Sequence, residues 1–274
     1  MGGYARPEGR ESGAPLFLFT DLDGTMIYSH RRRLEEPAVW VEELHGRRQS
    51  FMTRRSRVFF ETSPWLSVIP VTARTTAQYL RLMDSFKALG WRHALVCGGA
   101  VLLRDGREDE AWREESLAAV SGDAGDFMRL LAAVRRDMPA GAVTAEEPFL
   151  FYVKTDEAER VWARLRVQAD PGRLTVVRDA RKVYCMPKSM DKGVAAGRYL
   201  ARFCGGSKTS WAAAGDSELD VPMLLRADLS LYPPSLDHAM GAAGGEKIVC
   251  AGVLADAICH ELERRRNEVE DFDQ

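Results

Sequence analysis

Short apolar runs alternate along the chain with segments whose apolar residues recur at helical spacing. Leu16–Thr20 is a continuous apolar run, which suits a strand buried on both faces. Ser67–Thr72 is a second run, and Thr75–Leu89 after it has the spacing of a helix that Gly90 can end. His93–Cys97 is a third run. Strands that alternate with helices predict a parallel sheet, with ligands at the carboxyl ends of its strands.

The regular alternation of expected strands and helices is interrupted between about Val101 and Pro187. We interpret this region as a separate α+β insertion. Its expected elements are extended or apolar runs at Val101–Leu103, Phe149–Lys154, Leu174–Val177 and Lys182–Met186, and helices at Asp126–Arg136 and Asp156–Gln168. The alternating pattern then resumes, with helices at Asp191–Phe203, after Ser217 and at Val253–Arg266, and strands at Ser210–Ala214 and Leu229–Tyr232.

This organisation predicts an α/β protein with a Rossmann-like parallel sheet and an inserted α+β domain. We expect a flexible tail over residues 1–14, a core domain over 15–98 and 188–274, and the inserted domain over 99–187. The first residues are polar and glycine-rich and lack the apolar stretch of a signal peptide.

Composition narrows the class of protein. The 274 residues are 46% hydrophobic and 28% charged, and 38 basic against 40 acidic side chains leave a formal charge of −2. This balance is typical of a globular protein and excludes a disordered polyelectrolyte or a protein that coats nucleic acid. The five cysteines include no Cys-x-x-Cys pair, which argues against a disulfide framework or a zinc ribbon. From these cysteines we expect a reduced, cytoplasmic protein. No apolar run reaches membrane-spanning length, so we expect no membrane partner.

Four polar clusters each fall at the end of an expected strand or the start of the next helix. They are Asp21 with Asp23, Thr72, Lys192, and Asp216 with Asp220. Taken singly, such residues are ordinary helix caps, turn residues or solvated side chains. Together at one sheet edge they suit phosphoryl transfer, because a carboxylate can attack phosphorus while a cation and an ammonium group neutralise the phosphate. Carboxylate oxygens favour Mg²⁺ over zinc.

In their order the motifs resemble those of the haloacid dehalogenase (HAD) superfamily of phosphatases. The matching segments are Asp21-Leu22-Asp23-Gly24-Thr25, Pro70-Val71-Thr72-Ala73-Arg74, Lys192-Gly193 and Gly215-Asp216-Ser217-Glu218-Leu219-Asp220. The resemblance implies that Asp21 is the nucleophile that forms an aspartyl-phosphate, and that Asp23 protonates the leaving alcohol and then activates water. It also implies that Thr72 and Lys192 bind the phosphoryl group.

The same resemblance implies a Mg²⁺ site. Asp21, the backbone carbonyl of Asp23 and Asp216 would hold the ion, and Asp220 would be a further ligand or would support the others from behind. Lys188 competes with Lys192 for the third motif, but Lys192 has Gly193 beside it as the family pattern requires, and we favour Lys192.

The insertion resembles the α/β cap of the Cof-like and sucrose-phosphatase-like branch, which includes mannosyl-3-phosphoglycerate phosphatase. Such a cap covers the site and selects the substrate, with Gly98-Gly99 and Met186-Pro187-Lys188 as expected hinges. Leu219 stands where the Cof-like pattern often has Asn. Candidate substrate-binding residues are Lys154, Arg178 and Arg181 of the cap and Arg74 of the second motif; Glu146, Phe149, Tyr152 and Tyr184 are further cap residues that could determine specificity.

An arginine-rich segment lies between the first two motifs, over residues 31–57. It contains Arg31, Arg32, Arg33, Arg47, Arg48, Arg54, Arg55 and Arg57, set against Glu35, Glu36, Glu42 and Glu43. We favour two solvated helix faces with Glu and Arg paired over a patch for an anion or nucleic acid.

The sequence therefore predicts a Mg²⁺-dependent phosphomonoesterase that acts on a small phosphorylated metabolite, with a sugar phosphate as the favoured class. Two alternatives stay open: a phosphotransferase or mutase on the same scaffold, and an anion- or nucleic-acid-binding protein that uses the segment 31–57. The identity of the substrate and the oligomeric state are open as well.

Overall fold

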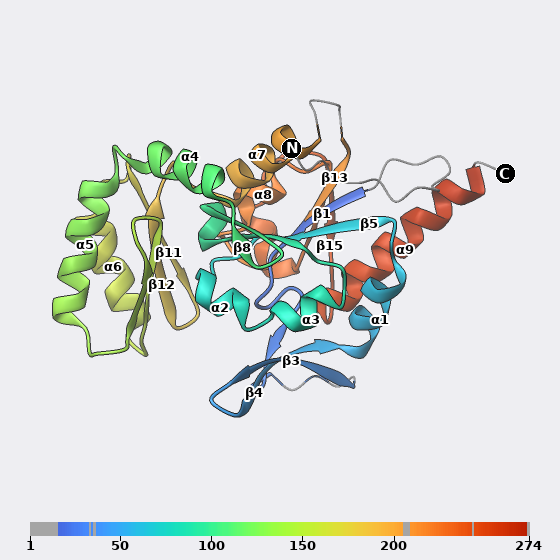
Figure 1. Cartoon of the computed structure of the whole chain (residues 1–274), viewed down its shortest axis with the longest axis horizontal. Coiled ribbons are helices and arrows are strands. Elements are labelled where there is room, and N and C mark those ends of the chain that lie inside the picture. Colours follow the sequence, from blue (N-terminus) through green and yellow to red (C-terminus); the bar gives the residue numbers. More distant parts are fainter. Residues whose placement is uncertain (1–15, 33, 35–36, 205–208, 243, 273–274) are drawn as a thin grey trace.

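The computed structural model describes residues 16–32, 34, 37–204, 209–242 and 244–272. The expected tail over residues 1–14 lies outside this part of the chain. A parallel sheet with helices around it forms one lobe, and a second, smaller lobe carries its own antiparallel sheet (Figure 1). A short hairpin projects from the first lobe.

The central sheet has the strand order β15-β14-β13-β1-β5, and every neighbouring pair is parallel. The strands are β1 (Leu16–Thr20), β5 (Leu66–Pro70), β13 (Trp211–Ala214), β14 (Leu229–Tyr232) and β15 (Glu246–Val249). Successive side chains point to opposite faces, so Leu18 and Phe19 of β1 enter two different hydrophobic clusters. The continuous apolar runs are thus explained by burial on both faces.

Helices cover both faces of this sheet. The face of Phe19 packs against α7 (Lys192–Phe203) and α8 (Val221–Leu224), whereas the face of Leu18 packs against α1 (Arg54–Thr62), α3 (Met83–Lys87) and α9 (Leu254–Phe272). On the second face, Phe60, Phe86 and Ile258 are among the buried contacts. None of the helices in the described residues is long and apolar enough to cross a membrane.

Beyond β5 the sheet continues through one bridge to an antiparallel extension. Val71 pairs with Leu95, which brings β6 (His93–Val96) beside β5, and β6 pairs with β7 (Val101–Arg104), which pairs with β8 (Arg107–Glu108). β7 therefore hydrogen-bonds to the core strand β6, whereas the sequence predicts that the apolar run Val101–Leu103 begins the insertion. The single helix expected over Thr75–Leu89 is two, α2 (Thr76–Leu80) and α3, because Leu82 donates to the carbonyl three residues back and interrupts the helix.

The second lobe is the inserted α+β unit. Its antiparallel sheet has the order β11-β12-β10-β9, and α4 (Glu110–Val120), which the sequence did not predict, leads into it. The strands are β9 (Val143–Glu146), β10 (Leu150–Lys154), β11 (Leu174–Asp179) and β12 (Lys182–Pro187), and the helices are α5 (Ala124–Asp137) and α6 (Ala158–Gln168). Both helices pack on one face of the sheet around Phe151 and Val183, which gives the unit a core of its own. The predicted α/β class with an α+β insertion is confirmed.

The arginine-rich segment corrects our expectation of two helix faces. Its described part forms two strands, β3 (Ala38–Leu44) and β4 (Arg47–Thr53), and its end enters α1. The preceding β2 (Tyr28–Ser29) pairs with β4 to complete the small antiparallel sheet β2-β4-β3. His45 and Gly46 both have positive φ, as the two-residue turn of a hairpin requires. The remaining short elements are the 3₁₀ turns η1 (Cys97–Gly99) and η2 (Pro234–Ala239).

A buried histidine makes the core sensitive to acid. His93 of β6 lies 2.6 Å from the Tyr199 hydroxyl and packs against Phe203. Burial, assisted by the nearby Arg104, lowers the pKa of His93 from 6.5 to about 4. Between these two pH values the unfolded chain binds more protons than the folded protein, so the free energy of unfolding falls as the pH falls through this window.

We expect this loss to reach about 3 kcal/mol between pH 6.5 and pH 4, because one pKa unit corresponds to about 1.4 kcal/mol. The variant His93→Asn keeps a polar atom near the Tyr199 hydroxyl and has no proton to gain, so its stability should fall less over the same range. Urea unfolding at a series of pH values measures the difference. Equal slopes for the two proteins would contradict the assignment.

Candidate active site

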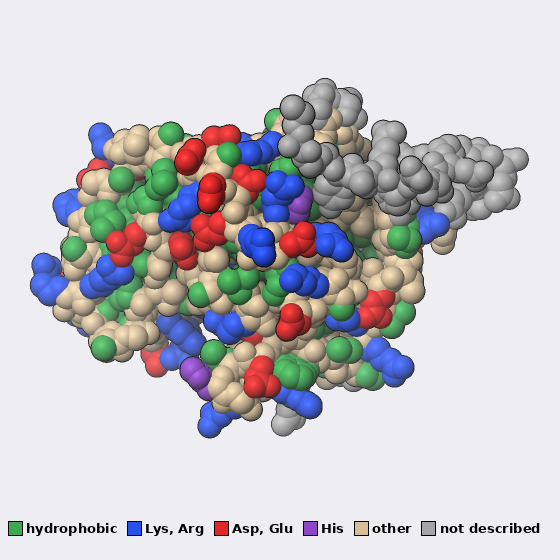
Figure 2. All heavy atoms as spheres, in the orientation of Figure 1, with side chains coloured by type: hydrophobic (Ala, Val, Ile, Leu, Met, Phe, Trp, Pro, Cys, Tyr) green, Lys and Arg blue, Asp and Glu red, His purple; other side chains and the backbone are tan. Residues whose placement is uncertain are grey.

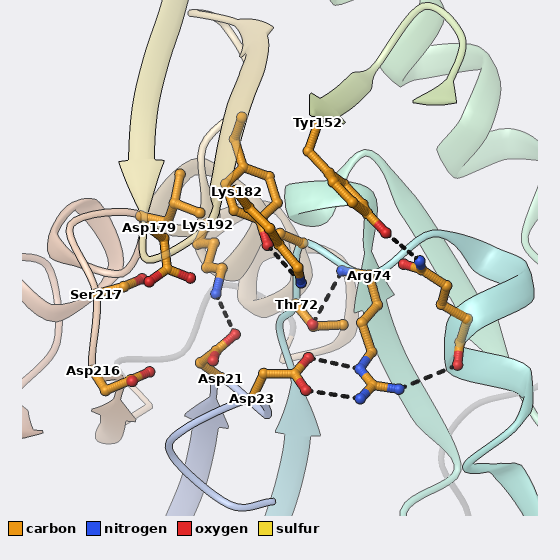
Figure 3. Close-up of a pocket in the computed structure, with 14 residues that line it drawn as sticks. Asp21, Asp23, Thr72, Arg74, Tyr152, Asp179, Lys182, Lys192, Asp216 and Ser217 are labelled. Carbon is orange, nitrogen blue, oxygen red and sulfur yellow. Dashed lines mark hydrogen bonds and ion pairs between the residues drawn. The ribbon is translucent and has the colours of Figure 1, made fainter. Parts of the chain in front are cut away.

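The four predicted clusters meet at the carboxyl end of the central sheet. Asp21 follows β1 and is tied to β13 by its N–H, which donates to the Ala214 carbonyl at 2.9 Å. Thr72 follows β5, and Asp216 follows β13. Lys192 opens α7 and points toward Asp21 from the neighbouring helix (Figure 3). The parallel topology thus brings side chains together that are up to 199 residues apart, from Asp21 to Asp220.

A buried ion cluster forms the centre of the site. The Lys192 ammonium nitrogen lies 2.5 Å from one oxygen of Asp21 and 2.5 Å from one oxygen of Asp220. The second oxygen of Asp220 accepts hydrogen bonds from the N–H groups of Asp216 and Ser217 at 3.1 and 2.9 Å, and from the Ser217 hydroxyl at 2.9 Å. Asp220 therefore fixes both the ammonium group and the loop that carries Asp216.

In this cluster three carboxyl groups, those of Asp21, Asp216 and Asp220, lie around one ammonium group, that of Lys192. Burial raises the pKa of Asp21 well above its usual value, even though Lys192 opposes this effect. Burial also raises the pKa of Asp216 to about 7, and the nearby Asp220 adds to the rise. Lys192 is buried as well, but the carboxylates of Asp21 and Asp220 outweigh burial and raise its pKa, so it stays charged.

These acidic residues fit a divalent cation. Asp21, Asp216 and Asp220 each offer a carboxylate oxygen, and these three atoms lie within 4.8 Å of one another. Oxygen donors are the ligands that Mg²⁺ prefers, and a cation here would neutralise carboxylates that burial otherwise makes unfavourable. Gly24 allows the close approach: its φ is +91°, and a Cβ there would overlap the Asp216 carboxylate.

Asp23 is held by an arginine instead of by the lysine. Two nitrogens of Arg74 donate to the two oxygens of Asp23, each at 2.7 Å. Loss of contact with water acts to raise the pKa of Asp23, but the charge and hydrogen bonds of Arg74 outweigh this effect and lower it. Asp23 is therefore a carboxylate at neutral pH, and its side chain is 47% exposed toward the pocket.

The inserted unit supplies the opposite wall of the pocket. Tyr152, Asp179 and Lys182 line it together with the core residues (Figure 3), and so does Tyr184. Gln78 of α2 donates to the Tyr152 hydroxyl at 2.6 Å, which links the two lobes across the pocket. The free volume between these side chains is about 30 Å³, which is room for roughly one or two water molecules.

The structure sorts the remaining candidate residues. Arg178 and Arg181 lie outside the pocket, where they pair with Glu159 at 3.0 Å and Asp156 at 2.6 Å, and Lys154 is exposed. Lys188 is exposed and donates to the carbonyl of Pro171 at 3.1 Å, so Lys192 and not Lys188 reaches the aspartates.

Sequence reasoning missed three of the lining residues, Gln78, Asp179 and Lys182. Lys182, Tyr184 and Met186 occupy every second position of β12. Since residues two apart in a strand share a face, the sequence places Lys182 on the same face as Tyr184. No comparable signal identifies Gln78, whose position depends on the tertiary packing of α2.

Comparisons with known proteins agree with the fold. No family model and no curated protein sequence matches the chain. Among solved structures, a sucrose-phosphatase from Synechocystis, in complex with sucrose and phosphate, is 15% identical with a TM-score of 0.59, over 92% of this chain and 98% of that one. A HAD subclass IIB sugar phosphatase is 13% identical with a TM-score of 0.56, over 91% and 98%. A HAD phosphatase from Bacteroides thetaiotaomicron is 13% identical with a TM-score of 0.53, over 94% and 98%.

These similarities extend over nearly the whole of each chain. They show that this protein has the fold of the HAD phosphatases, with a parallel core and an inserted α+β unit, as the motif resemblance implied.

Replacement of Gly24 tests the close approach to Asp216. Gly24→Ala places a side chain at positive φ and against the Asp216 carboxylate, whereas Gly46→Ala in the hairpin turn meets the same backbone strain with no atom within 4 Å. We expect both variants to lose about 1–2 kcal/mol of unfolding free energy from strain, and Gly24→Ala to lose about 1–3 kcal/mol more from the overlap. Urea unfolding of both variants gives the difference, and equal losses would argue against the overlap.

Proposed function

We propose that this chain, which has the fold of the HAD phosphatases, hydrolyses the phosphate monoester of a small metabolite through an aspartyl-phosphate on Asp21. The observation that carries the proposal is the buried pairing of Asp21 with Lys192 at 2.5 Å, at the carboxyl end of β1. A carboxylate at a strand end beside a fixed ammonium group suits attack on a phosphoryl group, whose charge the ammonium can neutralise.

In the first step an oxygen of Asp21 attacks phosphorus and the bond to the leaving oxygen breaks. Asp23 takes up a proton from water when the anionic phosphate binds beside it and opposes the effect of Arg74, and it then gives this proton to the leaving oxygen, which departs as an alcohol. Lys192 and the Thr72 hydroxyl bind the transferred phosphoryl oxygens. In the second step Asp23 takes a proton from water, which attacks the aspartyl-phosphate and releases inorganic phosphate and free Asp21.

We assign the divalent site to Asp21, Asp216 and the backbone carbonyl of Asp23. Mg²⁺ bound there would neutralise phosphate charge and raise the electrophilicity of phosphorus. Both carboxylate oxygens of Asp220 already accept hydrogen bonds, one from Lys192 and the other from the loop at residues 216–217. This supports the assignment of Asp220 to holding the site together from behind the ligands.

The inserted unit acts as the cap, and we propose 187 as its second boundary. The first boundary, predicted at 99, lies later in the chain in our proposal, because β7 and β8 extend the core sheet through β6. The cap's polar lining of Tyr152, Asp179, Lys182 and Tyr184 suits a leaving group rich in hydroxyl groups, which supports a sugar phosphate as the substrate class. The sugar phosphatases among the similar structures agree with this class. Since the free volume between the two lobes is only about 30 Å³, we propose that the substrate binds when the cap moves away from the core and the Gln78–Tyr152 contact breaks.

The nucleic-acid alternative has less support. On the face shown in Figure 2, acidic and basic side chains are interspersed, whereas a binding surface for nucleic acid needs a basic stripe. Within the described part of the segment 31–57, Arg57 pairs with Glu61, and Arg55 with Glu263.

Replacement of the nucleophile tests the proposal. We expect Asp21→Asn to lose phosphate release by at least about 10³-fold, because the amide cannot form the covalent intermediate. The measurement is inorganic phosphate released from a panel of sugar phosphates, nucleotides and an aryl phosphate, with Mg²⁺ present. Addition of alcohol acceptors separates hydrolysis from phosphoryl transfer, because a transferase would form a new ester in place of phosphate.

Two lysines supply a matched control for this assay. Lys192→Met should lose activity nearly as completely as Asp21→Asn, whereas the exposed Lys188→Met should keep it. Full activity of Asp21→Asn would overturn the proposed nucleophile, and loss with Lys188→Met alone would move the third motif to that residue.

The metal assignment predicts a second result. Chelation of divalent cations should abolish phosphate release, and Mg²⁺ should restore it. Asp216→Asn should weaken Mg²⁺ binding on the order of 10- to 100-fold, whereas Glu218→Gln, an exposed residue of the same loop, should not. Titration calorimetry with Mg²⁺ measures the affinity independently of activity, and equal affinities for the two variants would contradict the site.

A further inference from the structure

The small hairpin contributes a buried carboxylate to the site, and the motifs do not include it. Glu42 lies on β3 and is only 1% exposed, although the neighbouring Glu43 is exposed. It accepts hydrogen bonds from Ser50 of β4 at 2.5 Å and from Arg81 at 2.9 Å. Two further bonds come from Arg74, at 3.0 and 3.1 Å.

We infer that Glu42 is a positioning residue for the reaction, which acts through Arg74 to hold Asp23 in place. The inference rests on the proposed function, in which Asp23 protonates the leaving oxygen. Glu42 itself does not line the pocket, so its effect on the reaction has to pass through Arg74.

Arg74 is held between two carboxylates. Its Nε and Nη2 atoms donate to Asp23, and its Nη1 and Nη2 atoms donate to Glu42. The guanidinium group is planar, so two bidentate partners on adjacent edges fix its position and its plane. The Arg74 side chain is 10% exposed, and its other side-chain contact is a long one, 3.4 Å, to the carbonyl of Gln78.

Asp23 depends on this arrangement. Its side chain is 47% exposed, and both of its oxygens are bonded to Arg74 (Figure 3). A half-exposed carboxylate without a fixed partner samples several rotamers. The direction in which Asp23 faces the leaving oxygen is therefore set by Arg74, and the position of Arg74 is set by Glu42.

Glu42 is in turn fixed as an anion. Burial acts to raise its pKa, but the hydrogen bonds and charge of Arg74, with those of Ser50 and Arg81, outweigh burial and lower it. Charges thus alternate along Asp23, Arg74, Glu42 and Arg81. A neutral residue at position 42 would leave Arg74 with one anionic partner and free it to shift toward Asp23.

The test compares leaving groups. We measure kcat/KM for a series of phosphate monoesters, from aryl esters with acidic leaving alcohols to alkyl esters with weakly acidic ones. This constant reports steps up to the departure of the alcohol and omits the later hydrolysis of the aspartyl-phosphate. Acidic leaving groups depart without a proton, whereas alkyl alcohols need one, so only the latter depend on Asp23.

We expect Glu42→Gln to lower kcat/KM for alkyl esters about 10- to 100-fold and to leave the best aryl esters within about twofold of the unaltered protein. Glu43→Gln, one residue along the same strand, should change neither. In a protein that already carries Asp23→Asn, the replacement Glu42→Gln should have no further effect on any ester. Thermal unfolding of each variant reports whether the fold is retained.

The outcomes separate the two proposals. Equal losses for aryl and alkyl esters, or a further loss in the Asp23→Asn protein, would mean that Glu42 only stabilises the fold and would overturn the inference. If Glu42→Gln fails to fold, Glu42→Asp replaces it, which keeps the charge but shortens the reach, and it should show the same preference for aryl esters to a smaller degree. No phosphate release by the unaltered protein would overturn the proposed function, and the inference with it.

Discussion

The contact of Lys192 with Asp21 and Asp220 is the interaction on which the rest of the site depends. Lys192 stands at the first turn of α7, where the helix dipole disfavours a cation, and it is buried. Its charge is tolerated because two carboxylates lie 2.5 Å away. Removal of one partner of such a buried pair typically costs about 3–5 kcal/mol, because a charge is left without compensation. The strands β1 and β13 and the helix α7 must therefore keep this mutual position.

The fold was largely predictable where burial leaves a simple pattern. β14 has the bounds that its apolar run predicts, and α7 begins one residue after its cap Asp191. The prediction failed where polar residues form strands. β15 is an edge strand whose first two residues, Glu246 and Lys247, are charged. The hairpin β3–β4 carries Arg and Glu at exposed positions, which we interpreted as helix faces. Only the pairing of the two strands, which is a tertiary contact, decides between a helix and a strand for this segment.

The sequence predicts those site residues whose position depends only on the order and direction of the strands. Asp21, Thr72 and Asp216 follow strands, and the carboxyl ends of parallel strands meet at one edge whatever the loops do. Glu42 and Gln78 are different, because their partners depend on how the hairpin and α2 pack against the core. A buried glutamate within an arginine-rich segment has no signature in the sequence that separates it from the exposed Glu43 beside it.

The alternation of side chains along the strands of the inserted unit separates two tasks. On β10 and β12 the odd positions Phe151, Val153, Val183 and Cys185 build the core of the unit, and the even positions Tyr152, Lys182 and Tyr184 line the pocket. Exchanges at the even positions alter the pocket without opening a hole in the core behind it. Sequence divergence at every second residue of these two strands can therefore change the shape and polarity of the pocket, while the core of the unit and the acidic cluster of the other lobe stay unchanged.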